Sequence, residues 1–443
     1  MGLGRRLASH SAVIFAARLF GAGLTFLAQA AIARTFGPVT LGGYMLIFAT
    51  VNILAVIIPL GFETVGTYFA AEYRAKGEGR LLRGFVARAY INVAIVSLIM
   101  FFAGYPVAGL FGEPGRIVAL HWAPACLLTL ATGMVYVTSS LLVGLKHPFA
   151  GYFADSLFRP MAIIGAFLLG LLGATTEQSF SILIWGVALG YFAIAIGQLV
   201  FLLLALREVP TVVPARPREA ARWWRFAAPW VLISLASDFF FDIDLLLLSN
   251  QFGHGELAIF GVCTRVFALV SFGVAAVYSV TLPDIFESEA KADRVGFHRK
   301  IGDANLVATG LSVLLFCGMA AGAPIALMIF GPAFLAGAGP LVVLCGALIV
   351  RSAFGPASMV LSVNDRPYAA LPAIGLGIVA LVIGNLLLVP PFGLMGAALA
   401  ALASISLWSA AQWLTVWRVA KVDVSILARL MRPRPAASSA PIG

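Results

Sequence analysis

The sequence is dominated by long apolar segments that are separated by short polar connections. It has 443 residues, of which 61% are hydrophobic and 11% are charged, whereas soluble domains are roughly 45–50% apolar. A helix of about 20 apolar residues crosses the hydrocarbon core of a bilayer and satisfies its own backbone hydrogen bonds there. We therefore expect an all-α polytopic membrane protein. Twelve spans are predicted near residues 10–33, 41–70, 89–111, 117–144, 149–172, 179–206, 226–249, 257–283, 305–330, 336–362, 368–389 and 393–417.

Basic residues alternate between the two ends of these spans. The two termini and the connections after even-numbered spans carry 23 of the 29 Lys and Arg residues, and the opposite connections carry only Arg34 and Arg116. Because basic residues are retained on the cytoplasmic side, both termini are predicted to be cytoplasmic. The formal charge of +10 does not indicate nucleic-acid binding, since that function requires basic residues gathered on one exposed face.

Short sequence matches recur at a nearly constant separation along the chain. ARTFGPVTLGGYM from Ala33 corresponds to SNQFGHGELAIFG from Ser249, AEYRAKGE from Ala71 to FESEAKAD from Phe286, and LKHPFAGY from Leu145 to NDRPYAAL from Asn364. Because six spans separate the copies, both copies enter the membrane from the same side and form a parallel repeat. We expect two six-helix lobes with a transport path between them. The expected divisions are an N-terminal lobe at 1–210, a cytoplasmic linker at 211–225, a C-terminal lobe at 226–421 and a disordered cytoplasmic tail at 422–443.

Three stretches follow the pattern of a known family of membrane proteins. AAIARTFGPVTLGGYMLI, from Ala30, matches a turn between the first two helices. PLGFETVGTYFAAEYRAKGE, from Pro59, matches the approach to the first cytoplasmic loop, with Tyr68 where a basic residue is common. VPPFGLMGAALAALAS, from Val389, matches the entry to the last helix, with Ala401 in place of a threonine. Over nearly its whole length the chain resembles the multidrug/oligosaccharidyl-lipid/polysaccharide (MOP) exporter superfamily, and within it the polysaccharide flippases of the O-antigen type.

This resemblance implies two six-helix bundles that form a V around a central cavity, as in MATE transporters. It also implies movement of an undecaprenyl-diphosphate-linked saccharide across the bacterial inner membrane, for lipopolysaccharide or exopolysaccharide biosynthesis. Its partners would be membrane lipid and polysaccharide polymerase or glycosyltransferase assembly proteins. Composition and spacing by themselves indicate only a two-lobed transporter. A drug or small-cation antiporter of the same superfamily, and a polysaccharide-assembly scaffold that transports nothing, therefore stay open.

Nine acidic or basic residues lie within the predicted spans. Each costs about 2.5–3.5 kcal/mol at a helix centre on insertion scales, so it faces a partner or a hydrated cavity. Asp155 and Arg159 are four residues apart and close enough to pair, and this pair is either structural or part of the substrate contact. Arg18, Arg265 and Arg351 have no acid within one helical turn, so another helix or the substrate must supply their partners. Because a guanidinium fork suits diphosphate oxygens, these four arginines are the predicted cavity residues.

The stretch SDFFFDIDLLLLSN at 237–250 places three aspartates among apolar residues. In a continuous helix Asp238 and Asp242 share a face, whereas Asp244 is rotated from Asp242 by about 200°. Two carboxylates so placed repel each other when both are ionised, which favours proton uptake. We predict that Asp238 and Asp242 form an ion-coupling site that responds to protons or sodium. The alternative is that the aspartates pair with Arg265 and only lock two helices together.

No stretch has the pattern of a Walker A loop, a metal-ligand cluster or a nucleophile with its base. Four cysteines, Cys126, Cys263, Cys317 and Cys345, lie in apolar segments without a CxxC spacing or a histidine partner, which is typical of cysteines that act as small hydrophobic side chains. We therefore expect no enzymatic activity, no metal and no cofactor. The run RWWRF at 222–226 predicts a membrane-interface anchor, with its tryptophans at headgroup depth.

Overall fold

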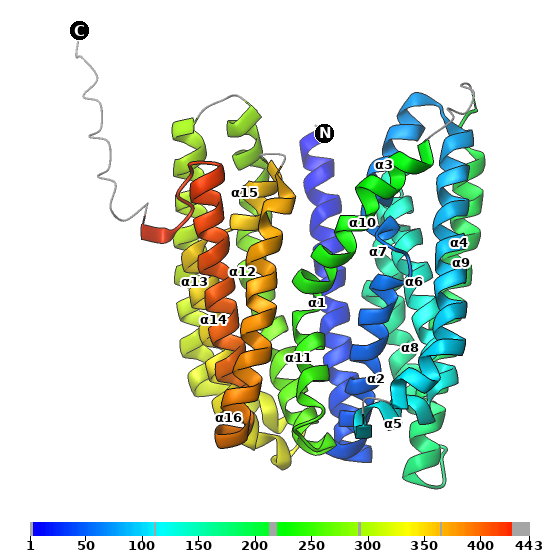
Figure 1. The fold of residues 1–443 in the computed structure, drawn as a ribbon, viewed down its shortest axis with the longest axis vertical. Helices are drawn as coiled ribbons and strands as arrows, with labels where there is room; N and C mark the ends of the chain where they lie inside the picture. The colour runs from blue at the N-terminus through cyan, green and yellow to red at the C-terminus, as the bar shows by residue number, and fades with distance from the viewer. Residues whose placement is uncertain (1–2, 110–111, 212–218, 291–293, 364–365, 428–443) are drawn as a thin grey trace. The chain divides into compact units, whose positions relative to one another are not determined.

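The computed structural model describes residues 3–109, 112–211, 219–290, 294–363 and 366–427, and nearly all of them are helical (Figure 1). Within these ranges, β geometry is confined to an isolated antiparallel bridge between Glu78 and Thr211. The helices are α1 (Leu3–Phe36), α2 (Pro38–Ile57), α3 (Phe62–Lys76), α4 (Gly79–Ala108), α5 (Gly112–Leu120), α6 (Trp122–Gly144), α7 (Pro148–Phe153), η2 (Ala154–Phe158), α8 (Arg159–Gly170), α9 (Thr176–Arg207), α10 (Glu219–Asp238), α11 (Phe240–Leu248), α12 (His254–Ala290), α13 (Arg294–Met328), η3 (Pro332–Gly337), α14 (Ala338–Phe354), α15 (Ala357–Val363), η4 (Pro367–Ala370) and α16 (Leu371–Val419).

Within the described residues, ten helical stretches are long and apolar enough to cross a membrane. One of them, Tyr368–Val419, comprises two spans, because Gly393 has a φ of 54° and breaks α16 shortly after Pro390 and Pro391. Together, α10 and α11 cover the predicted span at 226–249 and complete a set of twelve. The prediction of a polytopic all-α fold with about twelve spans is confirmed.

Helix starts recur at the separations of the three sequence matches. α2 begins at Pro38 and α12 begins at His254, as far apart as Ala33 and Ser249 of the first match. The starts of α4 and α13 are separated in the same way as the two copies of the second match. The starts of α7 and η4 coincide with the third match. Equivalent turns therefore occur at equivalent places in the two copies, which confirms the parallel repeat.

The second predicted span, 41–70, is interrupted where the sequence predicts a continuous helix. α2 ends before α3 begins because Leu60 and Gly61 have φ angles of 55° and 84°. A Cβ on Gly61 would lie 2.0 Å from the carbonyl oxygen of Ala227. The break is therefore fixed by the close approach of α10, a contact between segments that are far apart in the sequence.

By packing, the chain divides into two compact units. The first unit is Met1–Arg265 with Leu327–Ala336, and the second is Val266–Ala326 with Gly337–Gly443. The first unit therefore contains α10 and α11, which the repeat assigns to the second lobe. The lobe boundaries expected from the sequence follow the repeat rather than the packing, and they stay a prediction.

Structured residues extend into both the expected linker and the expected tail. α10 begins at Glu219, and residues 212–218 lie outside the described residues. After α16, Val424 is 1% exposed, and Asp423 accepts a hydrogen bond of 2.8 Å from a tryptophan indole of α16. The first residues of the expected tail are therefore described and make contacts, and residues 428–443 lie outside the described residues.

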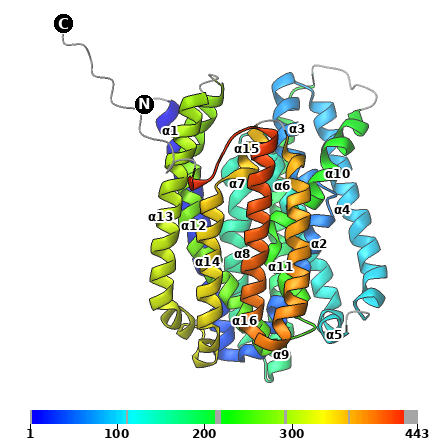
Figure 2. The same ribbon diagram turned by 60° about the vertical axis from the view of Figure 1, so that its left-hand side comes forward.

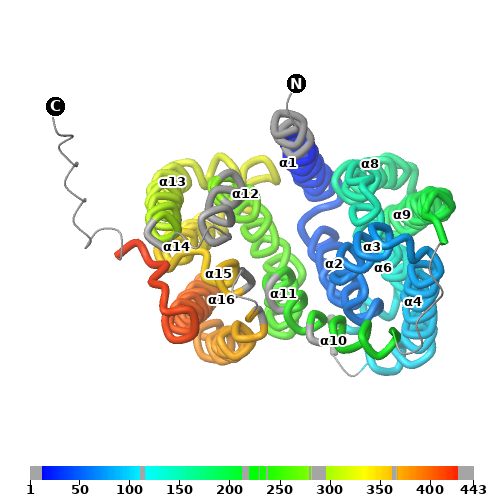
Figure 3. The backbone as a smooth tube through the Cα atoms, turned by 90° about the horizontal axis from the view of Figure 1, so that it is seen from above, coloured from blue at the N-terminus to red at the C-terminus, as the bar shows by residue number. Residues whose placement is uncertain are grey.

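In the first unit, α6 is the central helix and packs against α2, α3, α4 and α9 (Figure 3). Small residues allow this packing, since a Cβ on Gly144 would lie 2.5 Å from the carbonyl oxygen of Thr67. The apolar windows of α2 and α6 are 67% buried, whereas that of α4 is 28% buried and includes exposed side chains such as Phe102. Exposed apolar helix faces of this kind suit contact with lipid.

In the second unit, α14 packs against α16 (Figure 2). Ser404 donates to the carbonyl of Gly377 at 2.6 Å, across the break of α16. Asn305 of α13 accepts a hydrogen bond of 2.8 Å from Tyr278 of α12 and donates to the carbonyl of Val424 at 3.0 Å. Such interhelical hydrogen bonds hold helices together in lipid, where apolar surfaces gain little by meeting one another.

Candidate transport site

A chain of hydrogen-bonded polar side chains runs through the first unit. Arg159 Nη1 donates to Asp155 Oδ1 at 3.1 Å, so the pair expected from the four-residue spacing forms. Tyr191 of α9 donates its hydroxyl to the same oxygen at 2.9 Å. The Arg159 guanidinium lies over the Tyr191 ring, 4.9 Å from its centroid, and the Arg159 side chain is 14% exposed. The charge of Arg159 is therefore enclosed by polar and aromatic groups of its own protein.

The backbone that carries this pair is a π-helical turn, η2, in which the Arg159 amide donates to the carbonyl five residues back. Pro160 follows at the start of α8, and because proline lacks an N–H it removes one donor from the regular helical pattern. Helix α1 contacts the turn directly, since a Cβ on Gly21 would lie 1.5 Å from the carbonyl oxygen of Ser156. The sequence thus places Arg159 beside a widened turn that α1 can approach closely.

Asn52 of α2 connects this pair to α11. Its Oδ1 accepts a hydrogen bond of 3.1 Å from Arg159 Nη2, and its Nδ2 donates to Asp242 Oδ2 at 3.3 Å. Asn52 is 9% exposed and Asp242 is 7% exposed. The amide therefore uses both its acceptor and its donor to join two charged groups on different helices.

Arg265 of α12 is the last member of this series of hydrogen-bonded side chains. Its Nη2 lies 3.5 Å from Asp242 Oδ1, and its Nε is buried and has no hydrogen-bond partner among the described residues. We call Asp155, Arg159, Asn52, Asp242 and Arg265 the polar chain. Along it, two carboxylates alternate with two guanidinium groups, so the four charges balance, which lowers the cost of placing them within membrane helices.

The prediction that Asp238 and Asp242 share one helical face is wrong. α10 ends at Asp238, and α11 begins two residues later, after Phe239 with φ −116° and ψ 23°. Because the helix is broken here, the four-residue spacing does not align the two carboxylates. Asp238 is exposed and its charge acts on Glu63, whereas Asp242 pairs with Arg265. For Asp242, the arrangement that forms is the interhelical contact considered as the alternative.

The four predicted cavity arginines fall in both units. Arg159 and Arg265 belong to the polar chain. Arg18 on α1 is exposed, and its guanidinium lies 4.5 Å from the centroid of the Tyr152 ring. Arg351 is exposed in the last turn of α14, in the second unit. One hydrogen-bonded chain therefore joins two of the four arginines, and the other two are not members of it.

Asn52 and Tyr191 are site residues that the sequence analysis did not predict. Asn52 is the single amide in the apolar segment 38–57, and a buried amide in a membrane span requires hydrogen-bond partners. That signal was present in the sequence. Tyr191 had no comparable signal, because tyrosine packs in helices with or without a polar partner.

A second polar contact fastens α10 to α3. Arg222 donates to the two carboxylate oxygens of Glu72 at 2.8 and 3.2 Å, and the Trp223 indole donates to the hydroxyl of Tyr73 at 2.7 Å. Burial raises the pKa of Glu72, but the hydrogen bonds from Arg222 and Lys76 outweigh burial and lower it. Trp223 is 7% exposed and packs against α3 through its hydrogen bond to Tyr73, and the membrane-interface anchor at RWWRF stays a prediction.

Comparison with known proteins identifies the family. The family model described as "Polysaccharide biosynthesis protein" matches residues 7–289. A relative from Haloferax volcanii, the probable low-salt glycan biosynthesis flippase Agl15, is 25% identical over 404 residues, which cover 89% of this chain and 80% of the relative. The matched region includes both ends of the polar chain.

Solved structures of two transporter types share the fold. An inward-facing MATE family multidrug resistance transporter of the MOP superfamily has a TM-score of 0.75 at 14% identity, with 93% of this chain and 98% of that chain covered. The lipid II flippase MurJ in an inward closed conformation has a TM-score of 0.74 at 13% identity, with 91% and 87% covered. The chain thus has the fold that these two transporters share, and by its sequence it belongs to the family of polysaccharide biosynthesis proteins.

Proposed function

We propose that this chain is a flippase that carries a lipid-linked saccharide, of the undecaprenyl-diphosphate type, across the bacterial inner membrane for lipopolysaccharide or exopolysaccharide biosynthesis. The family and the glycan flippase relative support this class of function, and they favour transport over catalysis. The count of basic residues in the loops assigns both termini to the cytoplasm. A polysaccharide polymerase or glycosyltransferase assembly protein is the proposed protein partner.

One observation supports the proposal that Arg265 contacts the charged diphosphate group of the substrate. Arg265 has a buried Nε without a hydrogen-bond partner among the described residues, although its side chain is 34% exposed. A buried donor left unsatisfied costs about 1–3 kcal/mol, and a diphosphate oxygen would accept from it strongly. We therefore assign Arg265 to the diphosphate and propose Arg18 and Arg351, both exposed, as further cations along the transport path.

Arg159 has a different proposed role, because its donors already serve Asp155 and Asn52. In this proposal it lies in the site as a positioning residue. It orients the Asn52 amide, and through that amide it holds Asp242.

Ion coupling is proposed at Asp242. Its carboxylate contacts Asn52 and Arg265, and the charged or titratable side chains of Arg159 and Tyr136 lie within electrostatic reach. A proton or sodium ion on Asp242 would weaken its attraction for Arg265 and release the guanidinium for the substrate. The ion biases transport only if one conformation binds it more tightly than the other. Asp238 stays a predicted member of the ion site, without the argument from a shared helical face.

The test measures transfer of an undecaprenyl-diphosphate saccharide across sealed proteoliposomes. Arg265→Ala is expected to lower the initial rate by about tenfold or more, because a hydrogen bond to a charged group contributes roughly 1.5–3 kcal/mol. Arg265→Lys is expected to restore part of the rate, since lysine keeps the charge and loses the fork. Arg418→Ala, at an exposed arginine near the end of α16, is the matched control and should transport as the parent does.

Two outcomes would overturn the proposal. Transport by Arg265→Ala at the control rate, at equal protein level, would exclude the diphosphate contact. A deletion strain with normal glycan export and increased drug sensitivity would identify a drug antiporter instead. For the ion site, Asp242→Asn should insert normally and lose the dependence of transport on an imposed ion gradient, and an unchanged dependence would exclude Asp242 as the coupling residue.

A further inference from the structure

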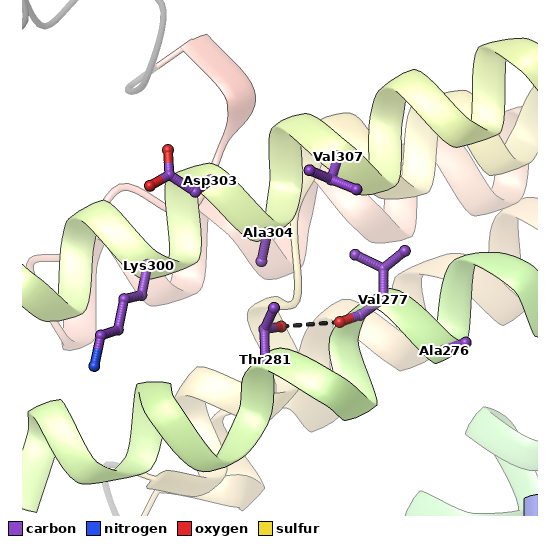
Figure 4. A pocket seen from close by; sticks show the side chains of 7 residues that line it. All are labelled: Ala276, Val277, Thr281, Lys300, Asp303, Ala304 and Val307. Carbon is purple, nitrogen blue, oxygen red and sulfur yellow. Dashed lines mark hydrogen bonds between the residues drawn. The ribbon is translucent and has the colours of Figure 1, made fainter. Parts of the chain in front are cut away.

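A pocket of about 550 Å³ lies between α12 and α13 in the second unit (Figure 4). This volume is within the range of about 300–1,000 Å³ that is typical of sites for small ligands. None of its lining residues belongs to the polar chain, and the pocket does not enter the function proposed above. The lining residues are Ala276, Val277 and Thr281 of α12 and Lys300, Asp303, Ala304 and Val307 of α13.

Small side chains face each other across the pocket. Farther along, a Cβ on Gly273 would lie 3.6 Å from Leu315, so α12 and α13 are close at that level. At the pocket, the facing side chains include Ala276 and Ala304, which are too small to fill the space. Thr281 donates its hydroxyl to the carbonyl of Val277 at 3.0 Å (Figure 4), so its polar group is satisfied within α12. Apart from Lys300 and Asp303, the lining side chains are therefore effectively apolar.

The pocket opens on a face of α13 that carries exposed apolar side chains. Val307 lines the pocket and is 58% exposed, and Leu306 and Leu314 are 43% and 68% exposed. Because α13 is among the helices apolar enough to span a membrane, this face is expected to meet lipid. An empty apolar hollow would forfeit dispersion contacts, and water would find few polar partners in it. Hydrocarbon is the filling that suits these walls.

A cation stands at one end of the pocket. Lys300 extends from α13 toward α12, whereas the carboxylate of Asp303 points away from α12 (Figure 4). Lys300 lies in the second turn of α13, which begins at Arg294, and basic residues at this position of a membrane helix stand at headgroup depth. The loop-charge count assigns this end of α13 to the cytoplasmic side.

We propose that the pocket binds an anionic glycerophospholipid, with one acyl chain between α12 and α13 and the headgroup phosphate on Lys300. The cytoplasmic leaflet is rich in anionic lipids, and a lysine near its surface contributes to their binding. An ordinary phospholipid fits better than a polyprenyl diphosphate, because the lining has a single lysine and lacks the arginine forks that suit a diphosphate. The bound lipid bridges the α12–α13 hairpin and stabilises it, as any ligand that binds only the folded state does.

The experiment uses the full-length protein, delipidated in detergent and titrated with dioleoylphosphatidylglycerol. Binding is followed by native mass spectrometry, and the site is located with a phosphatidylglycerol that carries a photoreactive group on its acyl chain. Two variants test the two halves of the site. Lys300→Ala removes the cation and should weaken binding about fivefold, which corresponds to about 1 kcal/mol for one lysine at the membrane surface. Val307→Trp fills the pocket from an exposed position and should abolish photolabelling of α12 and α13.

Arg299→Ala is the matched control. Arg299 is the neighbouring basic residue, is exposed and does not line the pocket, so its replacement should change binding by less than twofold. Dioleoylphosphatidylcholine, whose headgroup has no net charge, should bind the parent protein about as weakly as the anionic lipid binds Lys300→Ala.

Three results would overturn the proposal. The first is equal binding of phosphatidylglycerol by the parent and by Lys300→Ala. The second is photolabelling spread evenly over the lipid-facing helices α4, α9 and α13, which would indicate ordinary annular lipid. The third is displacement of phosphatidylglycerol by undecaprenyl diphosphate at an equal concentration, which would make the pocket a site for the carrier lipid. Because saccharide transport is not the readout, failure here leaves the proposed transport function untouched.

Discussion

At the scale of single residues, Asn52 holds the two halves of the polar chain together. Its carbonyl oxygen accepts from Arg159 and its amide nitrogen donates to Asp242. A primary amide offers an acceptor and a donor at once, and an apolar side chain of similar size offers neither. We therefore expect a change in either ion pair to reach the other through this one side chain.

Replacement of Asn52 by leucine tests this role. Asn52→Leu leaves Arg159 and Asp242 each without one hydrogen bond, and each buried bond left unmade costs about 1–3 kcal/mol. We expect saccharide transport in proteoliposomes to fall about tenfold or more and to lose its dependence on an ion gradient. The melting temperature in detergent should also fall, and it is measured on the same preparation.

Asn92 of α4 provides the matched control. It is 5% exposed, and its Nδ2 is buried without a hydrogen-bond partner among the described residues. Asn92→Leu therefore removes an unsatisfied group and should leave transport unchanged and the melting temperature equal or higher. If Asn52→Leu keeps the parental rate and gradient dependence, Asn52 does not couple the two ion pairs. An equal loss of transport in both variants would indicate general damage to packing.

The contacts of single side chains were predictable from the sequence where they are local. Asp155 and Arg159 are one helical turn apart, and their pairing follows from that spacing, even though the turn proves to be a π-helical one. The partner of Asp242 depends on how α2, α11 and α12 pack, so the sequence left Arg265 as one of two alternatives. Asn52 carries no charge, so the cost of burying a charge in the membrane, which singles out the aspartates and arginines, does not single it out.

At the scale of elements, helix positions were predictable and helix breaks were not. Apolar length and the repeated sequence matches located the spans, because both are properties of the amino-acid sequence alone. The break at Leu60 and Gly61 depends on the carbonyl of Ala227, which approaches from α10. The break at Phe239 separates α10 from α11 within a stretch of apolar residues and three aspartates that contains no Gly or Pro. At Gly61, tertiary packing overrides the local preference for helix, whereas no residue type at Phe239 signals a break in the sequence.

The contact between α10 and α3 gives a prediction at this scale. Glu72→Gln removes the charge that Arg222 engages through two donors and keeps the size of the side chain. We expect the amides of α10 to exchange hydrogen about fivefold faster or more, which corresponds to a loss of about 1 kcal/mol in local stability. Hydrogen exchange followed by mass spectrometry measures this in peptides from residues 219–238.

The pH dependence of this contact has a defined sign. The folded-state pKa of Glu72 lies below its ordinary value, although burial opposes the shift, because Arg222 and Lys76 stabilise the carboxylate. Its contribution to stability is therefore complete near neutral pH and is lost as the pH falls through the lowered pKa. Lys76→Ala is the control for Glu72→Gln in the hydrogen-exchange measurement on α10. Its effect should be smaller, because Lys76 is 50% exposed and an exposed pair one turn apart contributes only about 0.3–0.5 kcal/mol. If α10 exchanges equally fast in the parent and in Glu72→Gln, this contact does not hold the helix.

At the scale of the whole molecule, the fold class was predictable because it depends on average properties of the chain. Apolar content set the membrane environment, and the parity of spans between the sequence matches set the parallel repeat. The compact units were not predictable from the repeat, since α10 and α11 pack with the first unit although they begin the second copy. The boundaries of the repeat follow from sequence positions, whereas the compact units depend on tertiary contacts between helices.

Membrane topology provides the prediction that belongs to the whole molecule. Because basic residues are concentrated after even-numbered spans, fusions at those connections should report the cytoplasm, and fusions at the others should report the far side. Paired reporters measure this, with green fluorescent protein active in the cytoplasm and alkaline phosphatase active outside it. Cytoplasmic signals are expected after Lys76, Arg216 and Arg299, and external signals after Pro38, Gly115 and His254.

The fusion at His254 is the most direct test of the parallel repeat, since His254 lies at the start of α12 and Pro38 lies at the start of α2. A parallel repeat requires an even number of spans between these two equivalent positions, so a cytoplasmic signal at His254 with an external signal at Pro38 would contradict it.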